Sequence, residues 1–365
     1  MSQLRTVQVL GGGSAGSSAH VGSLASGLVA RGVQVTVCAP AELDRTYDFS
    51  ATGARFAPVP RRSDPAAVAA LRGACTGADV VHAHGPHAAV RAALALGGRR
   101  VPLVVTWHTR SHAEGARRRL LHLLERRAAR SAAVVLGASS DLVDRARRRG
   151  ARDARLAAVA TPAPRVHAAL PDGKVRAELG AVERPLIMAV GNLVPQHGFG
   201  ALLDAARAWR RLDRVPLLAI AGEGRERAAL QRRIKAEDLP VVLIGSRPDV
   251  TELLAAADLV VLPSRWEARS LLAQDALRIG VPLVATAVGG VPELVGDAAE
   301  LVPYGNAEAL ARSVARLLGD PAERDRMAAA GLAQAASWPT EDDTVAQVLS
   351  VYDELAQPPA VERSR

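Results

Sequence analysis

The chain has 365 residues, of which 49% are hydrophobic and 23% charged, with a formal net charge of +9 and two cysteines. A chain of this length and composition is expected to fold into two globular domains of roughly 150 residues each. It contains neither a run of roughly 18 apolar residues, as in a membrane-spanning helix, nor a signal peptide, so we expect a cytoplasmic protein. The two cysteines lack the spacing of a zinc site.

Short apolar, β-branched runs alternate with helical spacing in both halves of the chain, a pattern typical of doubly wound parallel sheets. A turn-rich segment near residues 160–173 interrupts the pattern and predicts an interdomain linker. We therefore expect a Rossmann-like domain at 1–165, a linker at 166–182, a second Rossmann-like domain at 183–340, and a helix with a disordered tail at 341–365. The expected strands lie at 6–10, 33–38, 80–82, 103–107, 134–136, 186–190, 217–221, 241–244, 259–262 and 283–285.

A glycine-rich stretch follows the first expected strand. Gly11, Gly13 and Gly16 have the G-x-G-x-x-G spacing of dinucleotide-binding enzymes. An NAD site also needs an acidic residue about 20 residues later, at the end of the second strand. That strand ends in Val-Cys-Ala-Pro at 37–40, without an acid. The glycines are therefore expected to turn a strand tightly into a helix, and an NAD cofactor is not expected.

The positive charge comes almost entirely from arginine and is concentrated in one quarter of the chain. Arginines at 117–119, at 126–127 and between 145 and 149 accompany leucines at helical spacing between 120 and 124. A basic amphipathic helix is typical of a contact with an anionic membrane surface or a nucleic acid, and a solvated helix face is the alternative. Nucleic acid is disfavoured because aromatic residues make up only 3% of the chain and none lies among these arginines.

Several ordered segments resemble family 4 retaining glycosyltransferases of GT-B fold. In the second half they begin at Val190 (VGNLVPQHGFGALLDA), Ala219 (AIAGEGRERAAL), Leu243 and Leu301, and in the first half they are VVHAHGPHAA and VVTWHTR. The resemblance implies two Rossmann-like domains facing each other across a cleft, with the C-terminal helix returning to the N-terminal domain. It also implies sugar transfer from a nucleoside-diphosphate sugar to a small-molecule or lipid-linked acceptor, with retention of configuration and without a metal or cofactor.

The resemblance places the donor in the C-terminal domain. Glu267 would act as a catalytic residue beside the transferred sugar, and a helix beginning near Ser270 would turn its positive N-terminus toward the diphosphate. The carboxylate of Asp275 would accept the ribose hydroxyls. The expected donor-binding set is Asn192, His197, Gly222, Glu223, Arg265, Arg269, Ser270, Leu271 and Asp275.

This set departs from the family pattern at the diphosphate. The family uses an arginine and a lysine there, where this chain has Asn192 and His197. The loss of two cations matters because charge-assisted hydrogen bonds are roughly twice as strong as neutral ones. One hypothesis is an active hexosyltransferase in which Arg265 or Arg269 supplies the missing charge. The other is a weak or inactive relative that binds another enzyme or a membrane surface.

The N-terminal domain is expected to bind the acceptor. Gly16 and His20 match the family loop G-G-x-x-x-H, in which Ala15 replaces the first glycine, and with Gly13 they are expected to line the acceptor pocket. His108 matches the family histidine near the reacting sugar and is the second expected catalytic residue. If the acceptor is a lipid, the basic helix would place the enzyme peripherally at the inner face of the membrane.

Three further histidines, His82, His84 and His87, cluster at the end of one expected strand. We expect them to orient the loop after that strand. A metal site is disfavoured because no set of carboxylates accompanies them.

Overall fold

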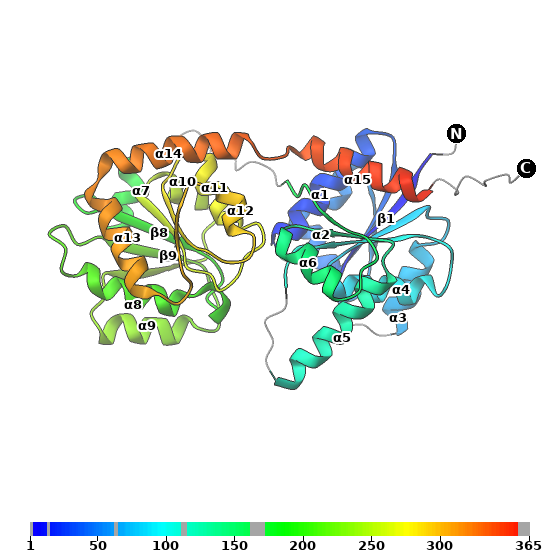
Figure 1. The fold of residues 1–365 in the computed structure, drawn as a ribbon, viewed down its shortest axis with the longest axis horizontal. Coiled ribbons are helices and arrows are strands. Elements are labelled where there is room, and N and C mark those ends of the chain that lie inside the picture. The colour runs from blue at the N-terminus through cyan, green and yellow to red at the C-terminus, as the bar shows by residue number, and fades with distance from the viewer. Residues whose placement is uncertain (1–2, 13–14, 62–64, 111–114, 161–171, 357–365) are drawn as a thin grey trace, which may run out of the picture. The chain divides into compact units, whose positions relative to one another are not determined.

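The computed structural model describes residues 3–12, 15–61, 65–110, 115–160 and 172–356 (Figure 1). Contacts divide the chain into two compact units. Unit 1 comprises Met1–Pro162 with Pro339–Arg365, and unit 2 comprises Ala163–Trp338. The C-terminal helix therefore belongs to the same unit as the N-terminal half of the chain. The tail expected at 357–365 lies outside the described residues.

Unit 1 is built on a parallel seven-stranded sheet of order β3-β2-β1-β4-β5-β6-β7. Its central strands are fully buried, as expected for a parallel sheet with helices on both faces. Gln8 of β1 pairs in register with His82 of β4, and His82 with Val104 of β5, so polar side chains enter the middle of the sheet. The strands are β1 (Arg5–Leu10), β2 (Gln34–Ala39), β3 (Arg55–Pro58), β4 (Val80–His84), β5 (Leu103–Trp107), β6 (Val134–Gly137) and β7 (Ala154–Leu156).

Helices connect these strands, and the C-terminal helix α15 packs on α1 (Figure 1). Gly27 permits this close packing, because a Cβ atom there would lie 2.5 Å from Cγ2 of Val345. Arg31, the residue directly after α1, also pairs with Asp342 of α15 at 3.0 Å. The helices are α1 (Ala15–Ala30), α2 (Ala41–Tyr47), the 3₁₀ turn η1 (Phe49–Thr52), α3 (Pro65–Ala74), α4 (Pro86–Leu96), α5 (Gly115–Ser131), α6 (Ser140–Arg148) and α15 (Glu341–Ala356).

Unit 2 has a parallel six-stranded sheet of order β10-β9-β8-β11-β12-β13. Consecutive residues of β8 point to opposite faces, and Ile187 and Met188 accordingly belong to two different buried apolar clusters. The strands are β8 (Leu186–Val190), β9 (Leu217–Ala221), β10 (Val241–Gly245), β11 (Leu259–Leu262), β12 (Leu283–Thr286) and β13 (Glu300–Val302). The helices are α7 (Asp172–Leu179), η2 (Pro195–His197), α8 (Phe199–Trp209), α9 (Arg227–Ala236), α10 (Val250–Ala255), α11 (Leu271–Arg278), α12 (Val291–Val295), α13 (Ala307–Gly319) and α14 (Pro321–Ala336).

The two parallel α/β halves confirm the fold class expected from the sequence, and the sheets are wider than predicted. Strands β3, β7 and β13 were not predicted, because each is only three or four residues long and lies at the end of its sheet. The segment 166–182 is also not linker throughout: it contains α7, because Val175 inserts into an apolar cluster of unit 2. None of the described helices combines the length and apolar character needed to cross a membrane.

Candidate active site

Four loops at the carboxyl ends of neighbouring strands form the candidate donor site of unit 2. This is the edge at which open parallel α/β sheets bind ligands. The N–H of Arg265 donates to the carbonyl oxygen of Gln196 at 2.8 Å, and the N–H of Gly290 donates to that of Glu267 at 2.9 Å. Backbone hydrogen bonds thus join loops that are far apart in the sequence. The loops span residues 191–198, 222–226, 263–270 and 287–290.

Two glycines let these loops approach each other backbone to backbone. Gly222 has a φ of 142°, and a Cβ atom there would overlap the carbonyl oxygen of Gly191. Gly198 has a φ of 70°, and a Cβ atom there would overlap the carbonyl oxygen of Pro263. A larger residue would be strained at either φ and would push the loops apart. Gly222, an expected donor residue, therefore holds the shape of the site.

Glu267 lies at the centre of this edge. The hydroxyl of Ser264 donates to Oε1 of Glu267 at 3.0 Å, and Nδ1 of His197 lies 3.7 Å from the same oxygen. Burial raises the pKa of Glu267 to about 7, and the bond from Ser264 opposes part of this rise. Thr286 fixes Ser264 by donating to its carbonyl oxygen at 2.6 Å. Near neutral pH Glu267 is thus present in both its protonated and its ionised form.

The two positions that the sequence predicts to hold the diphosphate carry no fixed positive charge. Asn192 is exposed, and its carbonyl oxygen accepts from the N–H of Val194 at 2.8 Å. His197 is partly buried, and this burial lowers its pKa below the ordinary value. At neutral pH His197 is therefore mostly uncharged. The cations nearest in sequence to Glu267 are Arg265, which is exposed, and Arg269, which is partly buried.

Two buried polar atoms of these loops have no hydrogen-bond partner within the part of the chain that the structure describes. They are Oε1 of Gln196 and Nε of Arg269. Burial lowers the pKa of Arg269, and the nearby carboxylate of Glu293 opposes this effect. Unpaired buried polar groups are costly, and in native proteins they often mark a place where a ligand or water binds. Gln196 was not expected from the sequence, because nothing in a lone glutamine indicates binding.

Helix α11 begins directly after Glu267 and Arg269. Ser270 is its N-cap, whose hydroxyl accepts from the N–H of Ala273 at 3.4 Å, and Leu271 is its first residue. Asp275 lies one turn further, and burial raises its pKa to about 6. Within the described residues, no hydrogen bond or ion pair joins Asp275 to Glu267. Glu223, on the loop after β9, pairs with Arg227 at 2.9 Å.

Unit 1 carries a cluster of histidines at the carboxyl ends of β4 and β5. His20 of α1, His84 and His108 each bring one ring nitrogen within 4.8 Å of the others. Nδ1 of His84 lies 3.2 Å from Nε2 of His108. The structure thus brings the expected acceptor residue His20 beside the expected catalytic residue His108. Gly16 is the second residue of α1, and Gly13 lies outside the described residues.

The remaining histidines of this group differ in their surroundings. His82 is fully buried between the hydroxyl groups of Tyr352 at 2.7 Å and Thr106 at 2.6 Å. His87 is exposed at the start of α4. Burial lowers the pKa of His82 to about 3 and that of His20 to about 4, so both rings are neutral at physiological pH. Tyr352 and Thr106 were not predicted as members of this cluster.

The basic helix α5 has an exposed apolar face. Leu120 is 57% and Leu123 is 61% exposed. The arginines 117–119 beside them are exposed as well. Two arginines of the later cluster, Arg145 and Arg149, instead pair with the buried Glu125, each at 2.8 Å. Because Arg145 and Arg149 are paired with Glu125, fewer arginines contribute to the exposed basic surface than the sequence suggested.

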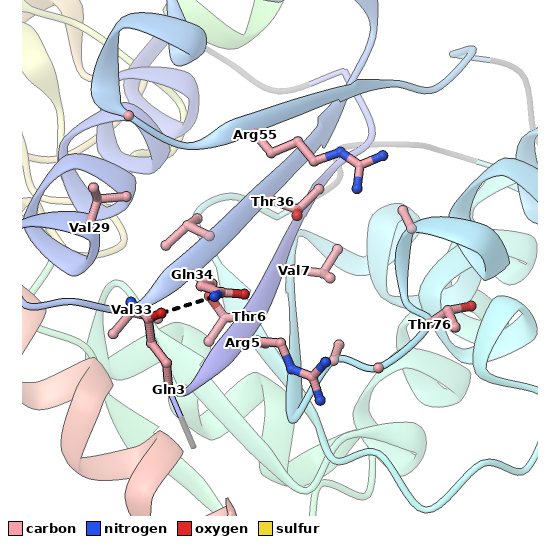
Figure 2. Close-up of a pocket in the computed structure, with 15 residues that line it drawn as sticks. Gln3, Arg5, Thr6, Val7, Val29, Val33, Gln34, Thr36, Arg55 and Thr76 are labelled. Atoms are coloured by element: carbon pink, nitrogen blue, oxygen red, sulfur yellow. Dashed lines mark hydrogen bonds between the residues drawn. The ribbon is translucent and has the colours of Figure 1, made fainter. Parts of the chain in front are cut away.

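A cavity of about 490 Å³ lies at the amino-terminal edge of the unit 1 sheet (Figure 2). Figure 2 shows Arg5, Gln34 and Arg55 around it, which are the first residues of β1, β2 and β3. The histidine cluster lies at the opposite, carboxyl edge of the same sheet. None of the residues expected to bind donor or acceptor lines this cavity.

Comparison with known families matches both halves of the chain. Residues 15–162 match the glycosyl transferase 4-like domain, and residues 173–334 match glycosyl transferases group 1. The chain is 35% identical over 224 residues, 56% of each chain, to alpha-D-kanosaminyltransferase of Streptomyces kanamyceticus. It is 33% identical over 204 residues to the GDP-mannose-dependent alpha-(1-6)-phosphatidylinositol monomannoside mannosyltransferase of Mycolicibacterium smegmatis, covering 50% of this chain and 52% of that one.

The chain thus spans about half the length of the curated relatives it matches. Among solved structures, HepE of Anabaena in complex with UDP-glucose superposes with a TM-score of 0.81 at 20% identity, over 97% of this chain and 100% of HepE. The fold is therefore that of GT-B glycosyltransferases, and each half of the chain matches a glycosyltransferase domain family.

Proposed function

We propose that this protein transfers a hexosyl group from a nucleoside-diphosphate sugar to an acceptor hydroxyl, with retention of configuration. The observation that carries the proposal is Glu267, a carboxyl group held by Ser264 at the ligand-binding edge of the group 1 domain. A carboxyl group at this edge is positioned to bind a sugar. Its burial makes the ionised form costly to the stability of the fold, and a residue kept in place at such a cost is typically functional. HepE, which shares the fold, is solved with UDP and with UDP-glucose, and this supports a nucleotide-sugar donor.

In the proposed reaction the bond between the anomeric carbon and the diphosphate breaks. The acceptor hydroxyl forms the new bond on the same face of the sugar, and its proton passes to the departing diphosphate oxygen. The protein positions both reactants and stabilises the charge on the leaving group. The N-terminus of α11 and the side chains of Arg265 and Arg269 are the proposed sources of positive potential, and Asp275 is proposed to bind the ribose. No step needs a metal or a cofactor.

We propose that the acceptor binds to unit 1, where Gly16 and His20 belong to the first turns of α1. His108 would contact the reacting sugar from the end of β5. Its imidazole is neutral, because burial lowers its pKa well below the ordinary value. A neutral ring suits hydrogen bonding to a sugar hydroxyl, because it has both a lone pair and an N–H group.

A screen of nucleoside diphosphates and nucleotide sugars tests the donor. At least one should raise the melting temperature, because a ligand at 100 times its Kd stabilises the folded state by about 2.7 kcal/mol. Mass detection with mixed acceptors should then show a product that retains the anomeric configuration. If none of the common nucleoside diphosphates stabilises the protein and no transfer is detected, the proposal is wrong.

The neutral clamp formed by Asn192 and His197 favours a second candidate function. In this alternative the protein is a weak or inactive glycosyltransferase relative that acts as a binding partner of another enzyme or of a membrane surface. It predicts little stabilisation by any diphosphate. Restoring the clamp cations would then improve nucleotide binding without producing turnover.

We further propose that α5 binds anionic membrane peripherally, at the inner face, when the acceptor is lipid-linked. The exposed leucines Leu120 and Leu123 beside three arginines match the apolar and charged parts of an anionic lipid surface. Sedimentation with phosphatidylglycerol vesicles should pellet the protein at low salt and release it at high salt. Leu120→Ser with Leu123→Ser should weaken pelleting, whereas equal recovery with and without vesicles would contradict this proposal and favour a small-molecule acceptor.

A further inference from the structure

A chain of buried hydrogen bonds crosses unit 1 from helix α15 to the end of β5. Nε2 of Gln8 donates to the hydroxyl of Tyr352 at 2.9 Å. Oε1 of Gln8 lies 3.0 Å from Nε2 of His84, and Nδ1 of His84 lies 3.2 Å from Nε2 of His108. His82 continues the chain on the other side of Tyr352. We call these residues, with Thr106, the histidine relay.

The amide of Gln8 sets the direction of every bond toward His108. Its Oε1 can only accept, so the proton of His84 is on Nε2. Nδ1 of His84 then has a free lone pair and accepts from Nε2–H of His108. A neutral imidazole has one proton, so Nδ1 of His108 is an acceptor. Among the described residues, this nitrogen has no hydrogen-bond partner.

Tyr352 is what holds the amide of Gln8 in this orientation. The Gln8 NH₂ group needs an acceptor, and the Tyr352 hydroxyl is its acceptor. That hydroxyl in turn donates to Nδ1 of His82, and Nε2–H of His82 donates to Thr106. If the amide turned over, each bond would reverse, and His108 would present an N–H instead of a lone pair. Gln8, His82 and Tyr352 are fully buried, so water does not reach them to replace a missing partner.

We propose that Tyr352 and Gln8 are positioning residues that fix the tautomer of His108, so that its Nδ1 accepts a hydrogen bond from a hydroxyl group of the substrate. This inference rests on the proposed function for its substrate, a sugar, and on the relay geometry for the tautomer. The lowered pKa values of His82 and His84 agree with it, because both rings stay neutral across the physiological range. The C-terminal helix thus influences the site through a side chain that touches no substrate.

The test reads the tautomers directly. In protein labelled with ¹⁵N-histidine and free of substrate, long-range ¹H–¹⁵N correlations should show His82, His84 and His108 as neutral Nε2–H tautomers from pH 6 to 8. Tyr352→Phe should shift His82 and His108 toward the other tautomer or a mixture. Gln8→Met should change His108 and leave His82 unchanged, because it breaks the relay between them.

Val348→Ala is the matched control, because Val348 is buried on the same helix and has no polar side-chain atom. It should lower the melting temperature and leave the tautomers and the pH profile of kcat unchanged. Tyr352→Phe should lower kcat about three- to tenfold, the effect expected of one neutral hydrogen bond lost from the transition state.

Two results would overturn the inference. One is an unchanged His108 tautomer in both Tyr352→Phe and Gln8→Met. The other is a content of about one zinc ion per chain in protein purified without chelator. His20, His84 and His108 could together hold a metal ion. Zinc on Nδ1 of His84 would occupy the lone pair that the relay needs. Failure of the proposed function is a separate result: wild-type protein would transfer no sugar, while the tautomers would still respond to the two variants.

Discussion

Replacing Glu267 by glutamine should make the protein more stable at pH 8 while it removes activity. The folded-state pKa of Glu267 is about 7, against an ordinary value of 4.5, because burial disfavours the ionised form. This difference of about 2.5 corresponds to about 3 kcal/mol at roughly 1.4 kcal/mol per pKa unit. Solvent reaches 22% of the Glu267 side chain, so we treat this as an upper value and expect about 1–3 kcal/mol.

The sign of the effect follows from proton binding. Below pH 4.5 the carboxyl is protonated in both the folded and the unfolded state, and wild type and Glu267→Gln should have similar stability. As the pH rises toward 7, the unfolded state ionises first, so wild type loses stability up to the folded pKa. Glutamine mimics the protonated form and does not titrate. The melting temperature of Glu267→Gln should therefore exceed that of wild type at pH 8 by several degrees.

Differential scanning fluorimetry at pH 5 and pH 8 measures this effect, with Asp213→Asn as a control at an exposed carboxylate of the same unit. Glycosyl transfer by Glu267→Gln should fall at least about a hundredfold, because a positioned electrostatic group at a transition state is worth about 10²–10³. A variant that is less stable than wild type at pH 8, or equally more stable at both pH values, would refute the desolvation argument. Unimpaired transfer would refute the proposed function of this carboxyl.

Two further predictions concern binding and folding. The double change Asn192→Arg with His197→Lys should tighten binding of a nucleoside diphosphate by about 1–3 kcal/mol, measured by calorimetric titration. Unchanged affinity would mean that other groups already hold the diphosphate or that no diphosphate binds there. Gly27→Ala should destabilise unit 1 by about 1–3 kcal/mol, because its methyl group would meet Val345 at 2.5 Å. Gly22→Ala on the same helix is its control, since there the nearest atom lies at 3.9 Å, and equal melting temperatures for both variants would contradict the packing argument.

The sequence predicted the strands that lie inside the sheets and the edge strand β10, and it missed the edge strands β3, β7 and β13. An inner strand such as β11 is buried on both faces, so its residues form a continuous apolar run. The edge strand β7 has only three residues, one of them buried, and its neighbours on the chain look like loop. Helix α7 was missed for a related reason. Its first residues belong to the turn-rich segment of the sequence, so they were predicted as part of the linker. Short elements with little burial leave too few residues for a periodic pattern.

The sequence predicted Glu267 and His108 as site residues, and it did not predict the residues that support them through hydrogen bonds. Ser264 lies three residues before Glu267, but a lone serine at the end of a strand has no distinctive signal. Tyr352 is 270 residues from His82, so only the folded chain reveals their contact. Motifs report residues that touch ligands, whereas supporting hydrogen bonds depend on how distant elements pack. The sequence also could not show that His197 and Glu267 lie 3.7 Å apart.

That distance means that a cation at position 197 would act on Glu267, whose pKa is raised by burial. A lysine in place of His197 would put a permanent charge close to the carboxyl, and two opposite charges about 4 Å apart near a protein surface attract by about 4 kcal/mol. This is comparable to the desolvation cost that raises the pKa of Glu267, so His197→Lys alone should return that pKa toward its ordinary value. The stability that Glu267→Gln adds at pH 8 should then shrink by more than half when the substitution is made in the His197→Lys background. If it persists, the lysine points away from Glu267, and a cation at position 197 does not offset the burial that raises the pKa of this carboxyl.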